Sequence, residues 1–588
     1  FMVLNLEKAT ECTTRSGLRA GFVHSVDFDL VSPVARACFW SARFHWLRDD
    51  ARTQRWPRHP NWRSTVTRIA YTAIPEWPPL AWLARCRPGH DAADVFHGAR
   101  VEVAAECFVE AVWAGRYSEM AFDRTDLIFG SGGRLRDGKL TFVSSATTVD
   151  RLQWLQRGET TWISNSMPCL LMAAEGVPDP TFPEYYDAFK SVIRGIREYQ
   201  REIPTSAGPA RLVYLDNLAW DGHTLRELGK PASTRDFGSF EKYRDFLQSS
   251  LKRLTENLSA AERRFPYRWL GTISSGYDSL TTAVLAKPLG LDEVISFTEA
   301  RGGEADSGEA AARLLGLRLS LIDRDAWRLT SLPEVPFVAS DAKGEDVFFR
   351  GAEGKLEGRV LLSGFHGGTA WDRDSAAADD DIVRGDQSGL SLTEFRLWAG
   401  FLHCPIAFAG ARQARDISTL SRSAEMRPWD VGGRYSRPIS RRIIETAGIP
   451  RGTFAVRKRA ASVLFFQHDG VLSPSSLEDL TRWLRGQEDE WRKRGLMPPT
   501  VRHPRKTIQQ TGAAIIAPII QGLVRATGNR FRLLNVAGRR LMNLAHPQRL
   551  FRYLFPWAIA RAGERYASGL RHVPAWQPRD PVTNAPQR

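Results

Sequence analysis

YRWLGTISSGYDSLTTAVLAKPLG, residues 267–290, is the stretch that decides the fold of this chain. Residues 267–273 form an apolar run that predicts a buried strand, and residues 280–287 predict a helix that stops at Pro288. Between them lies a turn of small and hydroxyl-bearing residues, 274–279. Backbone N–H groups in such a turn can approach phosphate oxygens closely, and the start of the following helix adds about half a positive charge. The stretch therefore predicts a phosphate-binding loop.

The segments after this loop continue the alternation of strand and helix. DEVISFTEAR predicts a second strand that ends at Phe297 and Thr298, EADSGEAAARLLG predicts a helix with Asp306 near its start, and LRLSLID predicts a third strand. This order is typical of an α/β domain with a parallel sheet, which binds its ligands at the carboxyl ends of the strands. The sequence predicts such a domain over residues 217–473.

The turn 274–279 resembles the S-G-G-x-D-S signature of the PP-loop ATP pyrophosphatases, with Ser275 in place of the first glycine. The resemblance implies a HUP-like fold that binds ATP and Mg²⁺, with Asp278 helping to hold the metal. The residues that it places against the nucleotide are Ser274, Ser275, Gly276, Asp278 and Ser279 at the pyrophosphate, and Phe297 and Thr298 at the adenine.

A second glycine-rich segment, SGFHGGTAWD at residues 363–372, resembles the S-G-x-G-x-D-E loop of the asparagine synthetase-like family. The resemblance implies that Gly364, Gly367 and Gly368 contact the nucleotide and that Asp372 is a second metal ligand. The acidic pair of the family is replaced by Gly368, Thr369 and Ala370. Two outcomes stay open: Asp372 reaches the metal from a rearranged loop, or the site binds nucleotide without efficient turnover.

Two further residues receive catalytic roles from the same resemblance. EMRPW, residues 425–429, resembles the family's E-x-R-x-P-F segment, and GIPRGTFAVRKRAAS, residues 448–462, resembles the stretch with its catalytic lysine. Lys458 is therefore expected to neutralise charge on the reacting phosphoryl and carbonyl oxygens. Glu394, on a predicted helix, is a candidate general base toward an amine. A solvated basic face remains the alternative for Lys458, and a non-catalytic place for Glu394.

The front half of the chain is β-like in pattern. KLTFV and TWISN alternate apolar and polar residues within residues 91–216, which predicts half-buried strands. WAGRYSEMAFDR and TTWISNSMPCLLMAAEG resemble late strands of the family's N-terminal glutaminase. The cysteine nucleophile of that enzyme has no counterpart at Phe1, and Cys12 follows no processing signal. We expect a degenerate, inactive Ntn-hydrolase-like domain, as in β-lactam synthetase; residues 1–90 receive no assignment.

Positive charge is concentrated in the predicted basic helical tail, residues 474–588. The chain carries a net charge of +15. Residues 501–588 contain fifteen Lys and Arg residues but only two acidic residues, Glu564 and Asp580. Three interpretations stay open: binding to an anionic membrane surface, binding to nucleic acid, or packing onto the catalytic domain with the arginines outward. The apolar stretch 512–524 is shorter than the roughly 20 residues needed to span a bilayer.

Taken together, these patterns predict a cytoplasmic enzyme, with peripheral attachment to the inner membrane surface as a variant of that location. The predicted activity is that of an ATP-dependent ligase, which adenylates a small-molecule carboxylate, releases pyrophosphate and forms an amide with an amine or ammonia. The alternatives are a tRNA-modifying PP-loop enzyme and a nucleotide-binding scaffold at a membrane.

Overall fold

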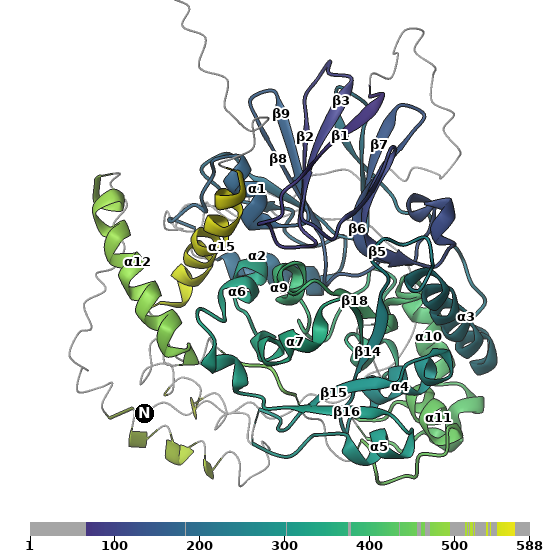
Figure 1. The fold of residues 1–588 in the computed structure, drawn as a ribbon. Helices are drawn as coiled ribbons and strands as arrows, with labels where there is room; N and C mark the ends of the chain where they lie inside the picture. The colour runs from purple at the N-terminus through teal and green to yellow at the C-terminus, as the bar shows by residue number, and fades with distance from the viewer. Residues whose placement is uncertain are drawn as a thin grey trace, which may run out of the picture. The chain divides into compact units, whose positions relative to one another are not determined.

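The computed structural model describes residues 66–182, 184–301, 303–373, 378–433, 435–455, 460–464, 471–493 and 550–570, with scattered positions between 512 and 541. Within these ranges a β-rich region comes first and an α/β region with a five-stranded parallel sheet follows (Figure 1). The prediction of a mixed α/β chain with a β-rich front part is thereby confirmed.

The β-rich region consists of two sheets that pack face to face. The seven-stranded sheet runs β1 (Arg68–Ala73), β3 (Ala92–His97), β2 (Trp82–Cys86), β9 (Thr160–Ser164), β8 (Leu152–Arg157), β11 (Ala210–Val213) and β10 (Glu202–Ile203). The six-stranded sheet runs β13 (Leu225–Leu228), β12 (Asn217–Trp220), β7 (Lys139–Val143), β6 (Ile128–Arg136), β5 (Cys107–Trp113) and β4 (Glu102–Ala104). Between the sheets, the buried ring of Trp82 lies 5.0 Å from that of Phe108 and 6.0 Å from that of Phe142.

This region extends at both ends beyond the predicted residues 91–216. β1 and β2 lie in the stretch 1–90 that received no assignment, and β12 and β13 lie in the stretch given to the α/β domain. β2 sits between β3 and β9 and is nearly buried throughout, so it lacks the alternation that marks a half-buried strand. β12 and β13 complete the six-stranded sheet by pairing back onto β7.

The α/β region is built on a sheet in which all neighbouring strands are parallel. Its order is β16 (Arg318–Ile322), β15 (Glu293–Phe297), β14 (Arg268–Thr272), β17 (Arg359–Ser363) and β18 (Leu402–Pro405). The chain moves outward from β14 to β16 on one side and then returns to β17 on the other. The strand order therefore reverses between β14 and β17, and in open parallel sheets this is the point at which ligands bind.

Helices surround both regions. They are α1 (Met167–Ala173), α2 (Tyr185–Lys190), α3 (Phe240–Leu258), α4 (Tyr277–Ala286), α5 (Glu309–Leu314), α6 (Val335–Asp341), α7 (Glu353–Leu356), α8 (Gly367–Ala370), α9 (Leu392–Ala399), α10 (Ala414–Ser421), α11 (Pro438–Thr446), α12 (Pro474–Lys493) and α15 (Leu554–Leu570). α4 follows β14, which confirms the predicted strand, turn and helix around residues 267–290.

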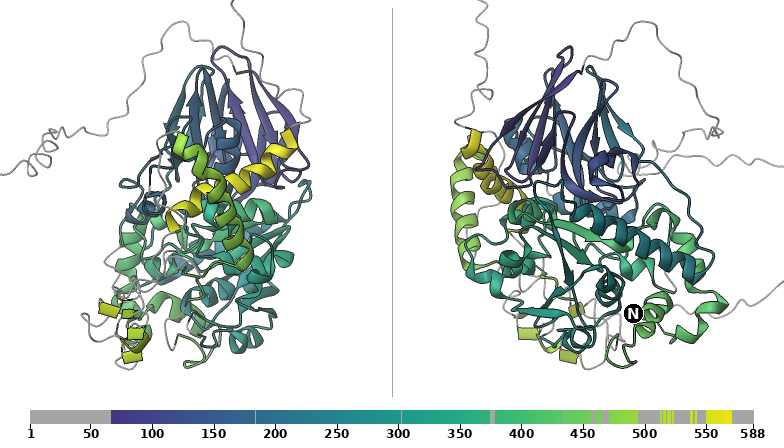
Figure 2. Two further views of the ribbon diagram at one scale, coloured as in Figure 1. Left: turned by 90° about the vertical axis from the view of Figure 1, so that its left-hand side faces the viewer. Right: turned by 45° about the vertical axis from the view of Figure 1, so that its right-hand side comes forward.

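The C-terminal helices α12 and α15 cross each other beside the two regions (Figure 2). Asp479 of α12 accepts hydrogen bonds from Trp557 Nε1 at 2.8 Å and from Arg561 Nε at 2.7 Å, both on α15. At the other end of α15, Trp77 Nε1 donates to the Tyr566 carbonyl at 3.0 Å. α15 therefore packs onto the rest of the chain, while a membrane or nucleic-acid partner of the tail stays a prediction. Across the described ranges, no helix has the length and apolar character needed to cross a membrane.

Candidate functional site

The predicted phosphate loop lies where β14 meets α4, at the carboxyl end of the central strand. Gly276 is the residue before the first turn of α4, and its N–H donates to Ser274 Oγ at 3.2 Å. The hydroxyls of Ser274 and Ser279 are 2.9 Å apart. The loop thus closes on itself through its small polar side chains at the positive end of a ten-residue helix.

Asp306, which was predicted near the start of a helix, instead forms hydrogen bonds with this loop. The backbone N–H and the hydroxyl of Ser275 both donate to Asp306 Oδ1, at 3.2 and 2.5 Å. The helix itself, α5, begins only at Glu309. Gly308 has a left-handed φ of +58°, and a Cβ there would lie 2.9 Å from the Ser274 backbone. Asp306 and Gly308 therefore hold the loop from the side of β15.

The second predicted loop, after β17, meets the first one directly. A Cβ on Gly364 would lie 2.4 Å from Asp278 C and from Ser279 N, a distance that real Cβ contacts do not reach. A Cβ on Gly367 would lie 2.9 Å from Asp278 Cβ. The glycines of residues 363–368 thus allow the two loops to touch at the point where the strand order reverses. The structure brings these predicted nucleotide-binding residues together.

The two predicted metal ligands also meet, through a residue that sequence reasoning missed. Arg437 Nη1 donates to Asp278 Oδ1, and Arg437 Nε lies 4.0 Å from Asp372 Oδ2. The described residues contain no group of three or more His, Cys, Asp or Glu side chains arranged to hold a metal. A Mg²⁺ ion at this place would therefore depend on these two carboxylates and on phosphate oxygens.

The predicted adenine contacts lie at the end of the neighbouring strand, β15. The half-buried ring of Phe297 is 4.6 Å from that of Phe348 and 5.2 Å from that of Phe349. Thr298 N donates to the Ile322 carbonyl at 3.0 Å and so extends the pairing with β16. Both residues are at the carboxyl edge of the sheet, one strand away from the phosphate loop.

Lys458 falls outside the described residues, but the chain on either side of it is described. The Ala455 N–H donates to the Ser275 carbonyl at 2.6 Å, and the Ala460 carbonyl accepts from Arg301 N at 2.7 Å. These contacts hold the described residues Ala455 and Ala460 against the backbones of Ser275 and Arg301.

Glu394 does not lie with the predicted nucleotide-binding residues. Its Oε1 accepts hydrogen bonds from Tyr566 Oη at 2.5 Å and from Trp398 Nε1 at 2.9 Å. The residue is 2% exposed, and burial raises the pKa of its carboxyl group. The prediction that α9 is a helix is confirmed, but this carboxylate faces α15 rather than the phosphate loop, because Tyr566 holds it there.

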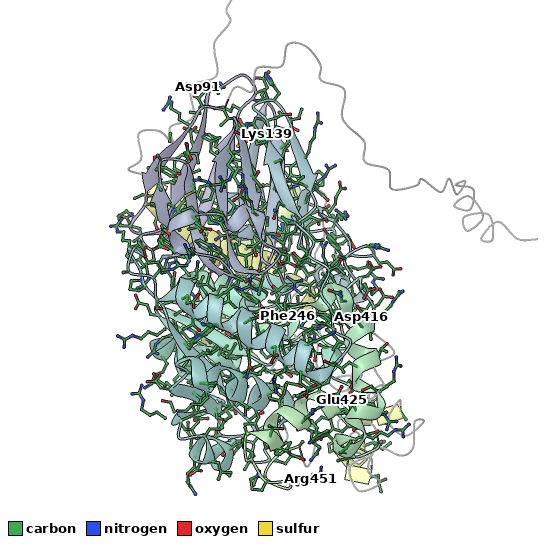
Figure 3. The ribbon with its side chains drawn as sticks, turned by 90° about the vertical axis from the view of Figure 1, so that its right-hand side faces the viewer. Asp91, Lys139, Phe246, Asp416, Glu425 and Arg451 are labelled. Atoms are coloured by element: carbon green, nitrogen blue, oxygen red, sulfur yellow. The ribbon has the colours of Figure 1, made fainter. Side chains whose placement is uncertain are left out.

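The EMRPW segment anchors the helices around the site. Glu425 Oε2 accepts from Phe240 N at 3.2 Å at the start of α3, and Glu425 Oε1 accepts from Arg442 Nη1 of α11 at 2.6 Å. Figure 3 shows Glu425 and Arg451 at this end of the molecule. Arg451 is tied to α11 as well, because its Nε donates to Glu445 Oε1 at 2.7 Å.

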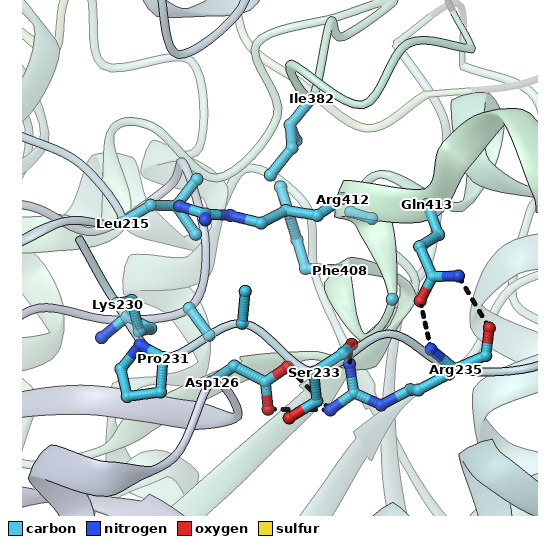
Figure 4. A pocket seen from close by; sticks show the side chains of 14 residues that line it. Asp126, Leu215, Lys230, Pro231, Ser233, Arg235, Ile382, Phe408, Arg412 and Gln413 are labelled. Atoms are coloured by element: carbon cyan, nitrogen blue, oxygen red, sulfur yellow. Dashed lines mark hydrogen bonds and ion pairs between the residues drawn. The ribbon is translucent and has the colours of Figure 1, made fainter. Parts of the chain in front are cut away.

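A separate cavity of about 60 Å³ lies between residues 408–413 and the β-rich region (Figure 4). Its lining includes Lys230, whose Nζ donates to the Ser144 carbonyl and to Asn217 Oδ1, both at 2.9 Å. Burial, together with the nearby charge of Arg412, lowers the pKa of Lys230 to about 7. Of the described residues that line this cavity, none belongs to the predicted nucleotide site.

We expect the contribution of Lys230 to stability to rise with pH. Its folded pKa of about 7 is below the ordinary value of 10.5, so between these values the unfolded chain binds more protons than the folded one. The free energy of unfolding of the wild type, relative to Lys230→Met, should therefore increase by up to about 2 to 3 kcal/mol between pH 7 and pH 9. Urea denaturation at several pH values measures this difference. Lys139 is exposed at the start of β7 (Figure 3). If the free energy of unfolding of the wild type relative to Lys139→Met rises equally with pH, the prediction is contradicted.

No protein-family model matches the chain, and a search of curated proteins finds no match either. What the chain does must be inferred from the residues described above.

Proposed function

We propose that this chain is an ATP-dependent ligase of the asparagine synthetase-like family, which transfers AMP to a carboxylate substrate and then forms an amide with an amine or ammonia. One observation carries the proposal: the serine-rich loop after β14 and the glycine loop after β17 touch at the reversal point of a parallel sheet. This is the position at which such sheets bind nucleotides. The order of the motifs along the chain supports the same family.

The residues have distinct parts in this reaction. The N–H groups and hydroxyls of residues 274–279 would bind the pyrophosphate portion of ATP. A carboxylate oxygen of the substrate would form a bond to the α-phosphorus as the bond from that phosphorus to pyrophosphate breaks. Lys458 would neutralise the charge that develops on the phosphoryl oxygens, and again on the carbonyl oxygen when the amine replaces AMP.

The pair of Asp278 and Asp372 fits a divalent cation, because both carboxylates already approach one cationic group, the guanidinium of Arg437. Together with phosphate oxygens they would hold Mg²⁺, which would supply neutralisation of the phosphate charge. Glu394 has no part in the proposal, since its carboxylate faces Tyr566. The amine is expected to lose its proton to another group or to solvent.

Analysis of the nucleotide products tests the proposal. Purified protein is incubated with Mg·ATP and with aspartate plus ammonia, and then with fractionated cell extract as a source of other carboxylates and amines. We expect AMP and pyrophosphate to appear in equal amounts and only when an acceptor is present. ADP as the product would contradict the proposal, because the loop would then transfer the γ-phosphoryl group.

A nucleotide-binding scaffold at a membrane is the second candidate function. Gly368, Thr369 and Ala370 in place of the acidic pair favour it on the nucleotide side. On the membrane side, described helical positions of the basic tail expose apolar side chains; these are Ile515, Ile516, Ile519 and Leu523. Retained ATP binding with no AMP in any extract, together with sedimentation on phosphatidylglycerol vesicles, would favour the scaffold. Co-purifying RNA would instead favour a tRNA-modifying enzyme.

A further inference from the structure

A buried guanidinium lies against the phosphate loop. Arg437 directly precedes α11, and its side chain is only 3% exposed. It lies over the rings of Tyr277 and Tyr435, with the guanidinium carbon 5.8 and 5.1 Å from the ring centroids. Its Nη1 donates to Asp278, which belongs to the loop itself. The site therefore contains a fixed positive charge that no motif in the sequence indicates.

The Arg437 guanidinium is charged, and one of its N–H groups makes no hydrogen bond to the described residues. Burial by itself would lower the pKa of Arg437, but the carboxylate of Asp278 and further anionic neighbours raise it, so the group stays ionised. Its buried Nε–H has no hydrogen-bond acceptor among the described residues, and Asp372 Oδ2, at 4.0 Å, is too far away. A buried donor without a partner is costly, and in a binding site it marks a place for a ligand atom.

The glycine loop leaves room for this group. A Cβ on Gly368 would lie 3.1 Å from Arg437 Nη2 and 3.9 Å from Asp278 Oδ2, so a longer side chain would crowd the guanidinium. Gly368 also stands in the region where the resemblance implies an acidic pair. At this point of the site the chain therefore carries the basic side chain of Arg437 and no acidic side chain at residues 368–370.

We propose that Arg437 binds the pyrophosphate portion of ATP, exchanging its contact with Asp278 for phosphate oxygens and so releasing Asp278 for Mg²⁺. The inference rests on the proposed function and names a binding residue for it. A planar guanidinium suits phosphate because two N–H groups can reach two oxygens at once. The N–H groups at the start of α4 and Arg437 would then approach the same anion from two sides.

Titration with inorganic pyrophosphate in EDTA tests this role, because it removes the metal from the measurement. Calorimetry on the full chain should show binding by the wild type and a dissociation constant about 10- to 100-fold higher for Arg437→Met. Arg437→Lys keeps the charge and should lose less. Arg441→Met is the matched control: Arg441 is also buried on α11, but its Nε and Nη2 donate to Tyr277 Oη. It should stay within about threefold of the wild type in pyrophosphate affinity.

The double variant Arg437→Met/Asp278→Asn covers the case in which the single variant fails to fold, since it leaves no unneutralised carboxylate at Asp278. Relative to Asp278→Asn alone, which removes a negative charge from the site, it should show the same loss of pyrophosphate affinity. If the folded variants bind pyrophosphate as the wild type does, the inference is overturned, and the proposed function stands provided that Mg·ATP still yields AMP. A wild type that binds neither pyrophosphate nor Mg·ATP would overturn both. Equal losses of pyrophosphate affinity in Arg437→Met and Arg441→Met would show that Arg437 has only a structural role.

Discussion

Arg396→Met is expected to lower the free energy of unfolding by about 3 to 5 kcal/mol, the largest loss of stability that we expect from a single substitution. Arg396 on α9 is 1% exposed and lies between two buried carboxylates of the β-rich region. Its Nη1 donates to Glu110 Oε2 at 2.6 Å and its Nε donates to Asp150 Oδ1 at 2.9 Å. Without the guanidinium both carboxylates remain buried with no cation, which is why the loss exceeds the value of an ordinary hydrogen bond.

Chemical denaturation followed by tryptophan fluorescence measures this loss. Arg318→Gln removes one partner of an exposed pair, with Asp292, and should change stability by less than about 1 kcal/mol. The triple variant Arg396→Met/Glu110→Gln/Asp150→Asn removes the three charges together and should recover much of the stability, because no charge is left buried alone. A loss below about 1 kcal/mol for Arg396→Met would show that solvent reaches these carboxylates.

Lys458→Ala is expected to lower the rate of AMP release by about 10²- to 10³-fold at saturating substrate. The reason is that a single positioned cation would stabilise the charge of both chemical steps, whereas the nucleotide is bound mainly by the loop 274–279. The KM for ATP should therefore change by only a few-fold. Steady-state measurement of pyrophosphate release, once a substrate is known, separates the two quantities.

The neighbours of Lys458 provide its controls. Arg457→Gln and Arg459→Gln remove the same charge one position away and should retain most of the activity. An equal fall in all three variants would instead favour the other interpretation of RKR, a solvated basic face that acts only through its summed charge. Full activity in Lys458→Ala would remove the catalytic role altogether.

Three strands of the parallel sheet, β14, β15 and β16, were predictable from the sequence to within one or two residues at each end, whereas β18 was not identified. The apolar runs before Ser274 and around Ile295 each end in small or polar residues, and turn residues on both sides limit the length of a buried strand. The β-rich region was harder to delimit. β12 and β13 are four residues each, and only their pairing with the distant strand β7 makes them part of a sheet.

The loops of the site were predictable and the contacts across it were not. Ser274, Gly276 and Asp278 are local in sequence, so a motif can identify them. Arg437 is 159 residues away from Asp278, and no local pattern distinguishes it from other arginines. Glu394 shows the converse error: its helix was predicted, but the direction of its side chain depends on Tyr566, 172 residues later.

The pairing of Glu394 with Tyr566 also has a consequence for the order in which the protein can be assembled on the ribosome. A chain grows by about 5 to 20 residues per second, so Tyr566 is made roughly 9 to 34 s after Glu394. During that interval the site that α15 will occupy against α1 and α6 is open to water. The α/β sheet can form before α15 is synthesised, but the surfaces of α1 and α6 that α15 covers are not yet buried by it. Among the described helices α15 is the last in chain order, and its packing covers the faces of α1 and α6 that earlier synthesis leaves exposed.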